Sequence, residues 1–495
     1  MALWCEQAWL AEGWRNNVRL GLDNGRISSI EIGVDAAPGD ERHAILLPAL
    51  PDLHSHAFQR GMAGLAECAG TGDDSFWTWR EVMYRFVDRL DPEGMHAIAA
   101  LAYAEMLESG FARVGEFHYL HHDPEGRPYG SVATMAQAIA AAAGETGIAL
   151  TLLPVFYAHS GFGGAAPTHG QRRFVNDLDG FAALLDGCRD AVSGLGDAVV
   201  GVAPHSLRAA TAGELAEVTA MAAGAPIHIH IAEQLPEVEA CLAWSGARPV
   251  EWLYDHADVG ADWCLVHATH ISEGERRAIV GSGAVVGLCP ITEANLGDGL
   301  FPAREFLAEG GRFGVGSDSN VEIDAAAELR LLEYGQRLSH RGRNLLASGA
   351  GQSTGASLYR GALTGGGQAL GRPSAGLGVG EAADIVSLKA DDPTFAGRSG
   401  DAILDSWIFG GAARLVDCVW RGGVKRVAGG RHVAREAIDA RYRAAVGALL
   451  ARPKAAPSTR VSAAISRRGS CRANGRRGRA SPMSINSWRP MAVRG

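Results

Sequence analysis

The chain has 495 residues, of which 47% are hydrophobic, 20% charged and 7% aromatic, and it carries a formal net charge of −9. This composition is typical of a globular protein and excludes a disordered, collagen-like or disulfide-scaffold protein. No stretch reaches the roughly 18 continuous apolar residues of a membrane span, and the N-terminus lacks the pattern of a signal peptide. The eight cysteines are dispersed without a CxxC motif, so we expect a cytoplasmic protein with reduced thiols.

The charge is divided unevenly along the chain. Residues 1–453 carry −19, whereas residues 454–495 carry +10 from one Lys and nine Arg without any acidic residue. This basic segment has neither helical nor strand periodicity, and we expect it to be disordered. It could be a nucleic-acid-binding arm or an incidental extension. We favour the extension, and no nucleic-acid partner, because nothing else in the chain is directed at nucleic acid.

Short β-like runs lie near both ends of the chain. Residues 1–46 contain two of them around Asp23-Asn24-Gly25, a strong hairpin signal. Residues 376–434 contain further runs of the same kind. We expect the two ends to form one small β-sandwich domain, with a C-terminal helix following at residues 435–453.

The intervening residues 47–375 alternate between apolar runs and Ala/Leu/Glu-rich helical stretches. Strands that alternate with helices predict a parallel sheet, and eight such units predict a (β/α)8 TIM barrel. Six runs carry His near their C-terminal ends and the last carries Asp318, which is where barrels of this kind place their active-site groups. The runs are residues 44–56, 112–122, 149–160, 198–208, 226–234, 263–270, 284–292 and 312–320.

Histidine spacing at these strand ends indicates a metal site. In the His54-Ser55-His56 motif, residues i and i+2 face the same side of a strand, so both imidazoles can bind one metal. The fifth run repeats the spacing in His228-Ile229-His230, one of which can be a ligand, and Asp318 can add a carboxylate. Three imidazoles and one carboxylate suit zinc, with iron or another divalent metal possible.

Two further groups lie at the strand ends. Glu233 comes three residues after His230, which suggests a proton shuttle beside a ligand, and His267 lies near the end of the sixth run.

The sequence resembles the amidohydrolase superfamily in its mononuclear metal-dependent deaminase branch, and most closely the formimidoylglutamate deiminases. The resemblance spans about residues 1–450 and is carried by the segments LPDLHSHAFQRGMAGL, VGEFHYLHHDPEGRPY, LLPVFYAHSGFGG, GVAPHSLRA, IHIHIAEQLPEVEACLAWSGARPVEWL and GLCPITEANLGDGLFPAREF, with LVHATH and GSDS. It implies hydrolysis of N-formimidoyl-L-glutamate to N-formyl-L-glutamate and ammonia in histidine degradation, with one zinc per chain and a homodimer.

The resemblance also implies a role for each matching residue. His54, His56, His230 and Asp318 would bind the metal, while Glu233 and His267 would transfer protons. The small-molecule substrate would contact Gln59, Arg80, Tyr119, His205 and Arg208, and Arg80 could act in a neighbouring subunit's site. The chain departs from the family pattern at Asn320, where relatives often have His.

Two other functions remain open at this stage. The chain could be a deaminase of a purine, pyrimidine or triazine ring, although such a pocket would need aromatic or apolar walls in place of carboxylate-binding Arg. It could also be a barrel without metal that serves as a scaffold, but a scaffold has no physical need for the complete set of His, Glu and Asp residues.

Overall fold

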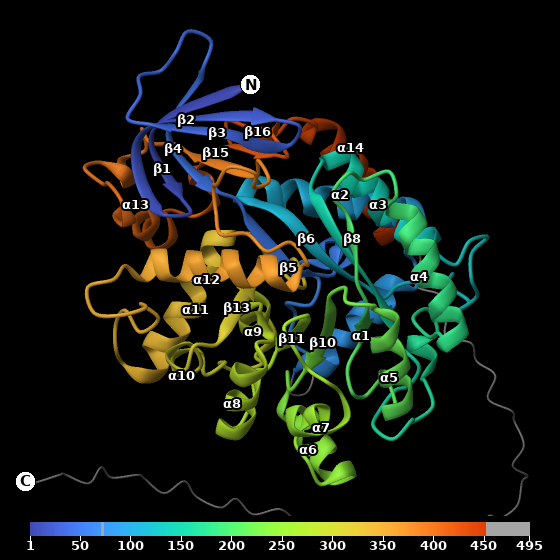
Figure 1. Ribbon diagram of the computed structural model, residues 1–495. Coiled ribbons are helices and arrows are strands. Elements are labelled where there is room, and N and C mark those ends of the chain that lie inside the picture. Colours follow the sequence, from blue (N-terminus) through green and yellow to red (C-terminus); the bar gives the residue numbers. More distant parts are fainter. Residues whose placement is uncertain (71–73, 452–495) are drawn as a thin grey trace, which may run out of the picture. The chain divides into compact units, whose positions relative to one another are not determined.

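The structure is a computed structural model that describes residues 1–70 and 74–451. The basic segment 454–495, expected to be disordered, lies outside these residues. The described chain is an α/β protein (Figure 1), and none of its described helices is long and apolar enough to cross a membrane. The strands are β1 (Ala2–Leu10), β2 (Gly13–Asp23), β3 (Arg26–Ile32), β4 (Glu41–Pro48), β5 (Leu50–Ser55), β6 (Phe111–His118), β7 (Ala149–Phe156), β8 (Val199–Val200), β9 (Ala203–Pro204), β10 (Ile227–Ile231), β11 (Trp263–His267), β12 (Val285–Leu288), β13 (Arg312–Val315), β14 (Ile385–Leu388), β15 (Val416–Arg421), β16 (Val424–Ala428) and β17 (Arg431–His432). The helices are α1 (Phe76–Val87), α2 (Pro92–Ser109), α3 (Thr134–Thr146), α4 (Leu178–Val192), α5 (Ala212–Met221), α6 (Leu235–Ser245), α7 (Pro249–His256), α8 (Glu273–Ser282), α9 (Pro290–Leu296), α10 (Ala303–Ala308), α11 (Ala325–His340), α12 (Thr354–Ala369), α13 (Asp401–Ser406) and α14 (Arg435–Ala451).

Strands from the two ends of the chain form a shared sheet. Its order is β17-β16-β15-β14-β4-β1-β2-β3, and the ends meet where β14 pairs antiparallel with β4. Figure 1 shows the blue N-terminal strands beside the orange and red C-terminal strands. A β-sandwich, which we expected here, has two separate sheets. The structure instead has a single eight-stranded sheet, because β14 pairs with β4 and joins the N-terminal strands to the C-terminal strands edge to edge.

The middle of the chain supplies the parallel strands. Each of the eight predicted runs contains a strand, and these pair in the orders β5-β6-β7-β8 and β10-β11-β12-β13, with β9 paired to β7. Backbone hydrogen bonds also join the edges of the two sheets. The amide of His228 donates to the carbonyl of Val202 (3.1 Å), and the amide of Asp318 donates to the carbonyl of His54 (2.9 Å). The ends of β5 and β13 are therefore neighbours, although more than 250 residues separate them in the sequence.

Helices alternate with these strands because the sequence carries helix-start signals between them. At α5 and α8 a Ser or Thr side chain accepts the N3 amide while a Glu side chain accepts the cap amide, as in a capping box. Strands β5, β6 and β7 are buried along their whole length, which agrees with a parallel sheet covered on both faces.

Close packing below the strand ends depends on glycine. A Cβ at Gly316 would lie 2.6 Å from the His54 carbonyl oxygen, so only glycine lets the chain leaving β13 approach β5 this closely. A Cβ at Gly365 of α12 would clash with the Phe313 carbonyl in the same way. This close approach brings the carboxyl end of β13, with Asp318, against the end of β5, with its two histidines.

Candidate active site

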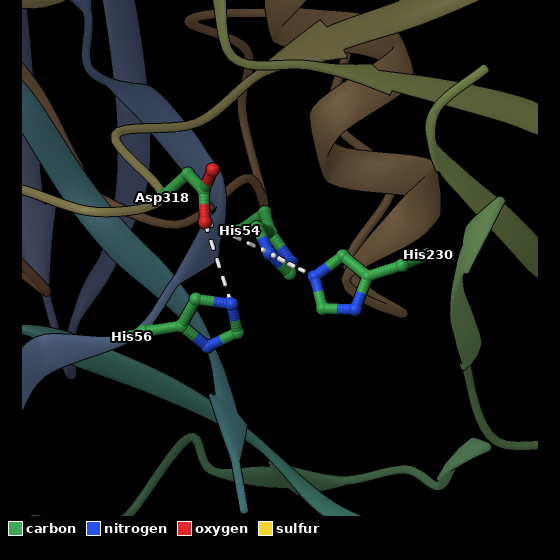
Figure 2. A group of neighbouring side chains, drawn as sticks. All are labelled: His54, His56, His230 and Asp318. Carbon is green, nitrogen blue, oxygen red and sulfur yellow. Dashed lines mark hydrogen bonds and ion pairs between the residues drawn. The ribbon is translucent and has the colours of Figure 1, made fainter. Parts of the chain in front are cut away.

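Four side chains converge at the carboxyl ends of β5, β10 and β13 (Figure 2). The Nε2 atoms of His54 and His230 are 3.1 Å apart. Asp318 Oδ1 lies 3.4 Å from His54 Nε2 and 3.3 Å from His56 Nε2. The structure thus brings together the four residues expected to bind metal.

The cluster fits a divalent metal. His56 Nδ1 donates to the Phe117 carbonyl (2.9 Å) and His230 Nδ1 to the His205 carbonyl (3.1 Å), which leaves the Nε2 lone pairs facing the centre. Burial lowers the pKa of His56 to about 3, so this ring is neutral. A tetrahedral site with metal–nitrogen bonds of about 2.05 Å has donor atoms about 3.3 Å apart. The distances in the cluster match that spacing, and without a cation the facing lone pairs would repel one another.

The backbone at the strand ends is unusual. Ala232, His267 and Asp318 all have left-handed φ values, of 52°, 69° and 45°. Residues other than Gly, Asn and Asp rarely adopt this region, and where they do they are concentrated at functional sites. Ala232 directly follows β10, His267 is the last residue of β11, and Asp318 lies three residues beyond β13.

His267 links three carboxyl groups. Its Nδ1 donates to Glu293 Oε1 (3.2 Å), and its Nε2 lies 3.8 Å from Glu233 Oε1 and 3.9 Å from Asp318 Oδ2. Burial opposes a charge on His267, but the three carboxylates outweigh it and raise its pKa to about 10. Burial also raises the pKa of Glu233 to about 7. The sequence analysis missed Glu293, which begins no recognisable motif and lies on α9, beyond the seventh strand.

All five residues expected to contact substrate line a pocket above this cluster. The pocket opens to solvent, and the space within it, with that open solvent included, is about 720 Å³. The five expected substrate contacts are Gln59, Arg80, Tyr119, His205 and Arg208. The lining also includes the residues expected to bind metal or transfer protons, namely His56, His230, Glu233, His267 and Asp318.

Two of these side chains are held by specific partners. Gln59 Nε2 donates to the Tyr119 hydroxyl (2.9 Å), while its buried Oε1 has no hydrogen-bond partner among the described residues and can accept from a ligand. The Arg80 guanidinium packs over the Trp77 ring, 4.3 Å from its centroid. Arg80 is among the residues that line the pocket of its own chain.

Arg208 has a carboxylate partner that the sequence analysis did not identify. Its side chain is only 14% exposed, and Nη1 lies 3.5 Å from Oε2 of the fully buried Glu237. The same Glu237 oxygen accepts the backbone amide of Glu233 (3.2 Å). Glu237 thus connects the residue expected to carry a proton with the residue expected to hold substrate. It lies one helical turn beyond Glu233, a spacing that could have drawn attention to it.

Asn320 joins the two loops that carry the metal-binding residues. Its buried Nδ2 donates to Ser55 Oγ (3.1 Å), the His56 carbonyl (3.1 Å) and the Asp318 carbonyl (3.0 Å), while Oδ1 accepts from Ser317 Oγ (2.7 Å). Asn320 therefore makes a dense set of hydrogen bonds between the two segments.

Replacing Asn320 with alanine is expected to weaken metal binding by roughly 10- to 100-fold, the usual cost of losing a group that supports metal ligands. Competition with a chelator measures the effect. Asn344→Ala is the matched control, because Asn344 also has a left-handed φ (54°) but is exposed and outside the pocket. Equal metal affinity in the two variants would show that Asn320 does not support the ligands.

Comparison with known proteins assigns the family. Residues 45–425 match the model of the amidohydrolase family, and the chain belongs to this family. Residues 1–44 match the N-terminal domain of formimidoylglutamate deiminase HutF. Over 453 residues the chain is 49% identical to the formimidoylglutamate deiminase of Pseudomonas aeruginosa, covering 91% of this chain and 99% of that protein. These matches confirm the resemblance that the motifs indicate.

Other proteins are similar to this chain in sequence or in structure. A crystal structure of an amidohydrolase from Brucella melitensis is 56% identical, with a TM-score of 0.88 over 91% of this chain and all of that one. The 8-oxoguanine deaminase of P. aeruginosa is 29% identical over 87% of this chain and 95% of its own length. The crystal structure of an adenosine deaminase from Xanthomonas campestris with bound zinc is 21% identical to this chain. The two superpose with a TM-score of 0.76 over 91% of this chain and 98% of that one. At this identity the match supports the fold and nothing further.

Proposed function

We propose that this chain hydrolyses N-formimidoyl-L-glutamate to N-formyl-L-glutamate and ammonia. The observation that carries the proposal is a pocket in which two arginines, Arg80 and Arg208, lie above the cluster of three His and one Asp. The substrate has two carboxylates and one amidine, so each arginine can bind one carboxylate. The 49% identity to a formimidoylglutamate deiminase supports the same substrate.

His54, His56, His230 and Asp318 would hold the metal, and we propose one zinc per chain. A divalent metal held there lowers the pKa of a bound water from 15.7 toward about 7. Three imidazoles and one carboxylate match the ligands that zinc prefers. Support also comes from the short distances between the four donor atoms.

The remaining residues handle protons. Asp318 Oδ2 and His267 Nε2 lie 3.9 Å apart, and the pair would orient and deprotonate the attacking water. Glu233, 3.8 Å from His267, would carry the proton to the departing nitrogen, which leaves as ammonia. Gln59 Oε1 would accept an N–H of the substrate.

We further propose that the two parallel sheets close into a (β/α)8 barrel over residues 47–375. The backbone hydrogen bonds between Val202 and His228, and between His54 and Asp318, support closure at both seams. Residues 1–46 and 376–434 would form the accessory β domain, and residues 435–453 the C-terminal helix.

A coupled assay for ammonia release tests the activity. The purified chain is offered formimidoylglutamate, formimidoylaspartate, guanine and cytosine at equal concentrations. We expect the largest kcat/KM with formimidoylglutamate. Preference for either base would instead support a ring deaminase, and release from none of the four with metal bound would contradict deimination.

Arg208→Met is expected to lower kcat/KM for formimidoylglutamate by at least about 10-fold. The variant removes a charge-assisted contact worth roughly 1.5–3 kcal/mol, and about 1.4 kcal/mol corresponds to one decade. Metal content should not change, because Arg208 is not a ligand. Arg208→Lys should restore only part of the loss, since lysine lacks the planar fork. Unchanged kcat and KM in Arg208→Met would remove Arg208 from the carboxylate site.

A further inference from the structure

A second group of metal-ligating side chains lies in the sheet formed by the chain ends, outside the pocket. His43 of β4 and Asp417 and Cys418 of β15 offer ligand atoms that all lie within 4.8 Å of one another. His43 Nδ1 is 3.9 Å from Asp417 Oδ2, and Cys418 Sγ is 3.5 Å from the same oxygen. We infer that these three residues form a second site for a thiophilic divalent metal such as Zn²⁺ or Co²⁺.

A β-bulge places the two neighbouring residues of β15 together. Ser387 of β14 pairs with Cys418 and Leu388 pairs with Val416, so Asp417 is the extra residue on β15. Successive side chains of a regular strand point to opposite faces, and a bulge breaks this alternation. The 3.5 Å contact between Asp417 and Cys418 shows that both side chains lie on one side here.

The environment of His43 prepares its ring for metal binding. Nε2 lies 2.9 Å from Glu41 Oε1, to which it can donate, and this leaves the Nδ1 lone pair directed toward Asp417. A carboxylate that fixes the tautomer and orientation of a ligating histidine is a common feature of metal sites. The ring also packs edge-on against Trp420, with centroids 4.9 Å apart. Glu41 forms an ion pair with Lys425, which balances its charge.

The donor set and its exposure define the metal. Nitrogen, oxygen and sulfur donors together suit zinc, and tetrahedral donor spacings of about 3.3–3.7 Å follow from bonds of roughly 2.0–2.3 Å. Cys418 is 6% exposed and the His43 side chain 9%, while the Asp417 side chain is 34% exposed and gives solvent access. On binding, the Cys418 thiol would lose its proton to solvent and form a sulfur–metal bond. One thiolate and one carboxylate then balance the two positive charges, and water fills the fourth position.

Cobalt binding to the full-length protein tests this inference. The cluster of His54, His56, His230 and Asp318 contains no thiolate, so a near-ultraviolet thiolate-to-cobalt absorption band reports on the second site. We expect two equivalents of Co²⁺ per chain with this band present. Cys418→Ser and His43→Gln should each bind one equivalent, and Cys418→Ser should lose the band. His56→Ala should keep one equivalent together with the band.

Cys289→Ser is the matched control, because the ligand atoms of Cys289, His267 and Asp318 all lie within 4.8 Å of one another and Cys289 could therefore contribute a thiolate at the active-site cluster. It should retain both the band and two equivalents. One equivalent in the unmodified chain, a band that persists in Cys418→Ser, or a band that disappears in Cys289→Ser would each overturn the inference. If the unmodified chain bound one equivalent, the role of His43 would be limited to its contacts with Glu41 and Asp417.

Discussion

His56→Ala is expected to abolish deiminase activity and to remove the metal equivalent held at the cluster. His56 Nε2 lies 3.3 Å from Asp318 Oδ1, and its loss leaves two imidazoles and one carboxylate for the metal. We expect activity to fall by more than the roughly 10²-fold that loss of a mere supporting group costs. Elemental analysis of the purified variant, alongside the ammonia assay, measures both effects.

His340→Ala serves as the control for His56→Ala, because His340 is exposed at the end of α11. It should keep full activity and metal content. If His56→Ala retained the same number of metal equivalents as this control, His56 would not be a ligand.

Glu233→Gln is expected to keep the metal but lose at least about 10²-fold in kcat, the usual contribution of a positioned acid–base group. The substitution preserves size and removes the proton-carrying carboxyl. Chelator competition and steady-state kinetics separate the two properties. Glu239→Gln makes the same change at an exposed position of α6 and should be active. A near-normal kcat in Glu233→Gln would mean that the proton reaches the leaving nitrogen by another route.

The sequence predicted which polar residues meet at the carboxyl ends of the strands, and the reason is physical. A parallel α/β fold brings all carboxyl ends to one side, so polar residues at corresponding ends of apolar runs must meet. His54, His230, His267 and Asp318 come from four such runs, and the structure places them around one point. The family resemblance added Arg208 and Gln59, whose spacing alone gave only a weak signal.

The contacts of Glu237, Glu293 and Asn320 did not follow from the same reasoning, although the chain position of Asn320 and the spacing of Glu237 were visible in the sequence. Each acts through contacts with a segment distant in sequence or through an unusual backbone conformation. Glu293 reaches His267 from α9, and Asn320 reaches Ser55 across the junction of the first and eighth strands. The single sheet at the chain ends was not foreseen either, because alternating apolar patterns define strands but not the order in which they pair.

The pairing of β4 with β14 has a consequence for biosynthesis. About 340 residues separate these strands, so at roughly 5–20 residues per second β14 leaves the ribosome some 20–70 s after β4. Throughout that interval β4 has only β1 beside it, and its other edge is open to pairing with another nascent chain. Folding in the cell must therefore keep an N-terminal half-sheet of four strands from associating until the last quarter of the polypeptide arrives to cover it. Truncations that end before residue 385 should expose this edge permanently and be recovered mainly as aggregates.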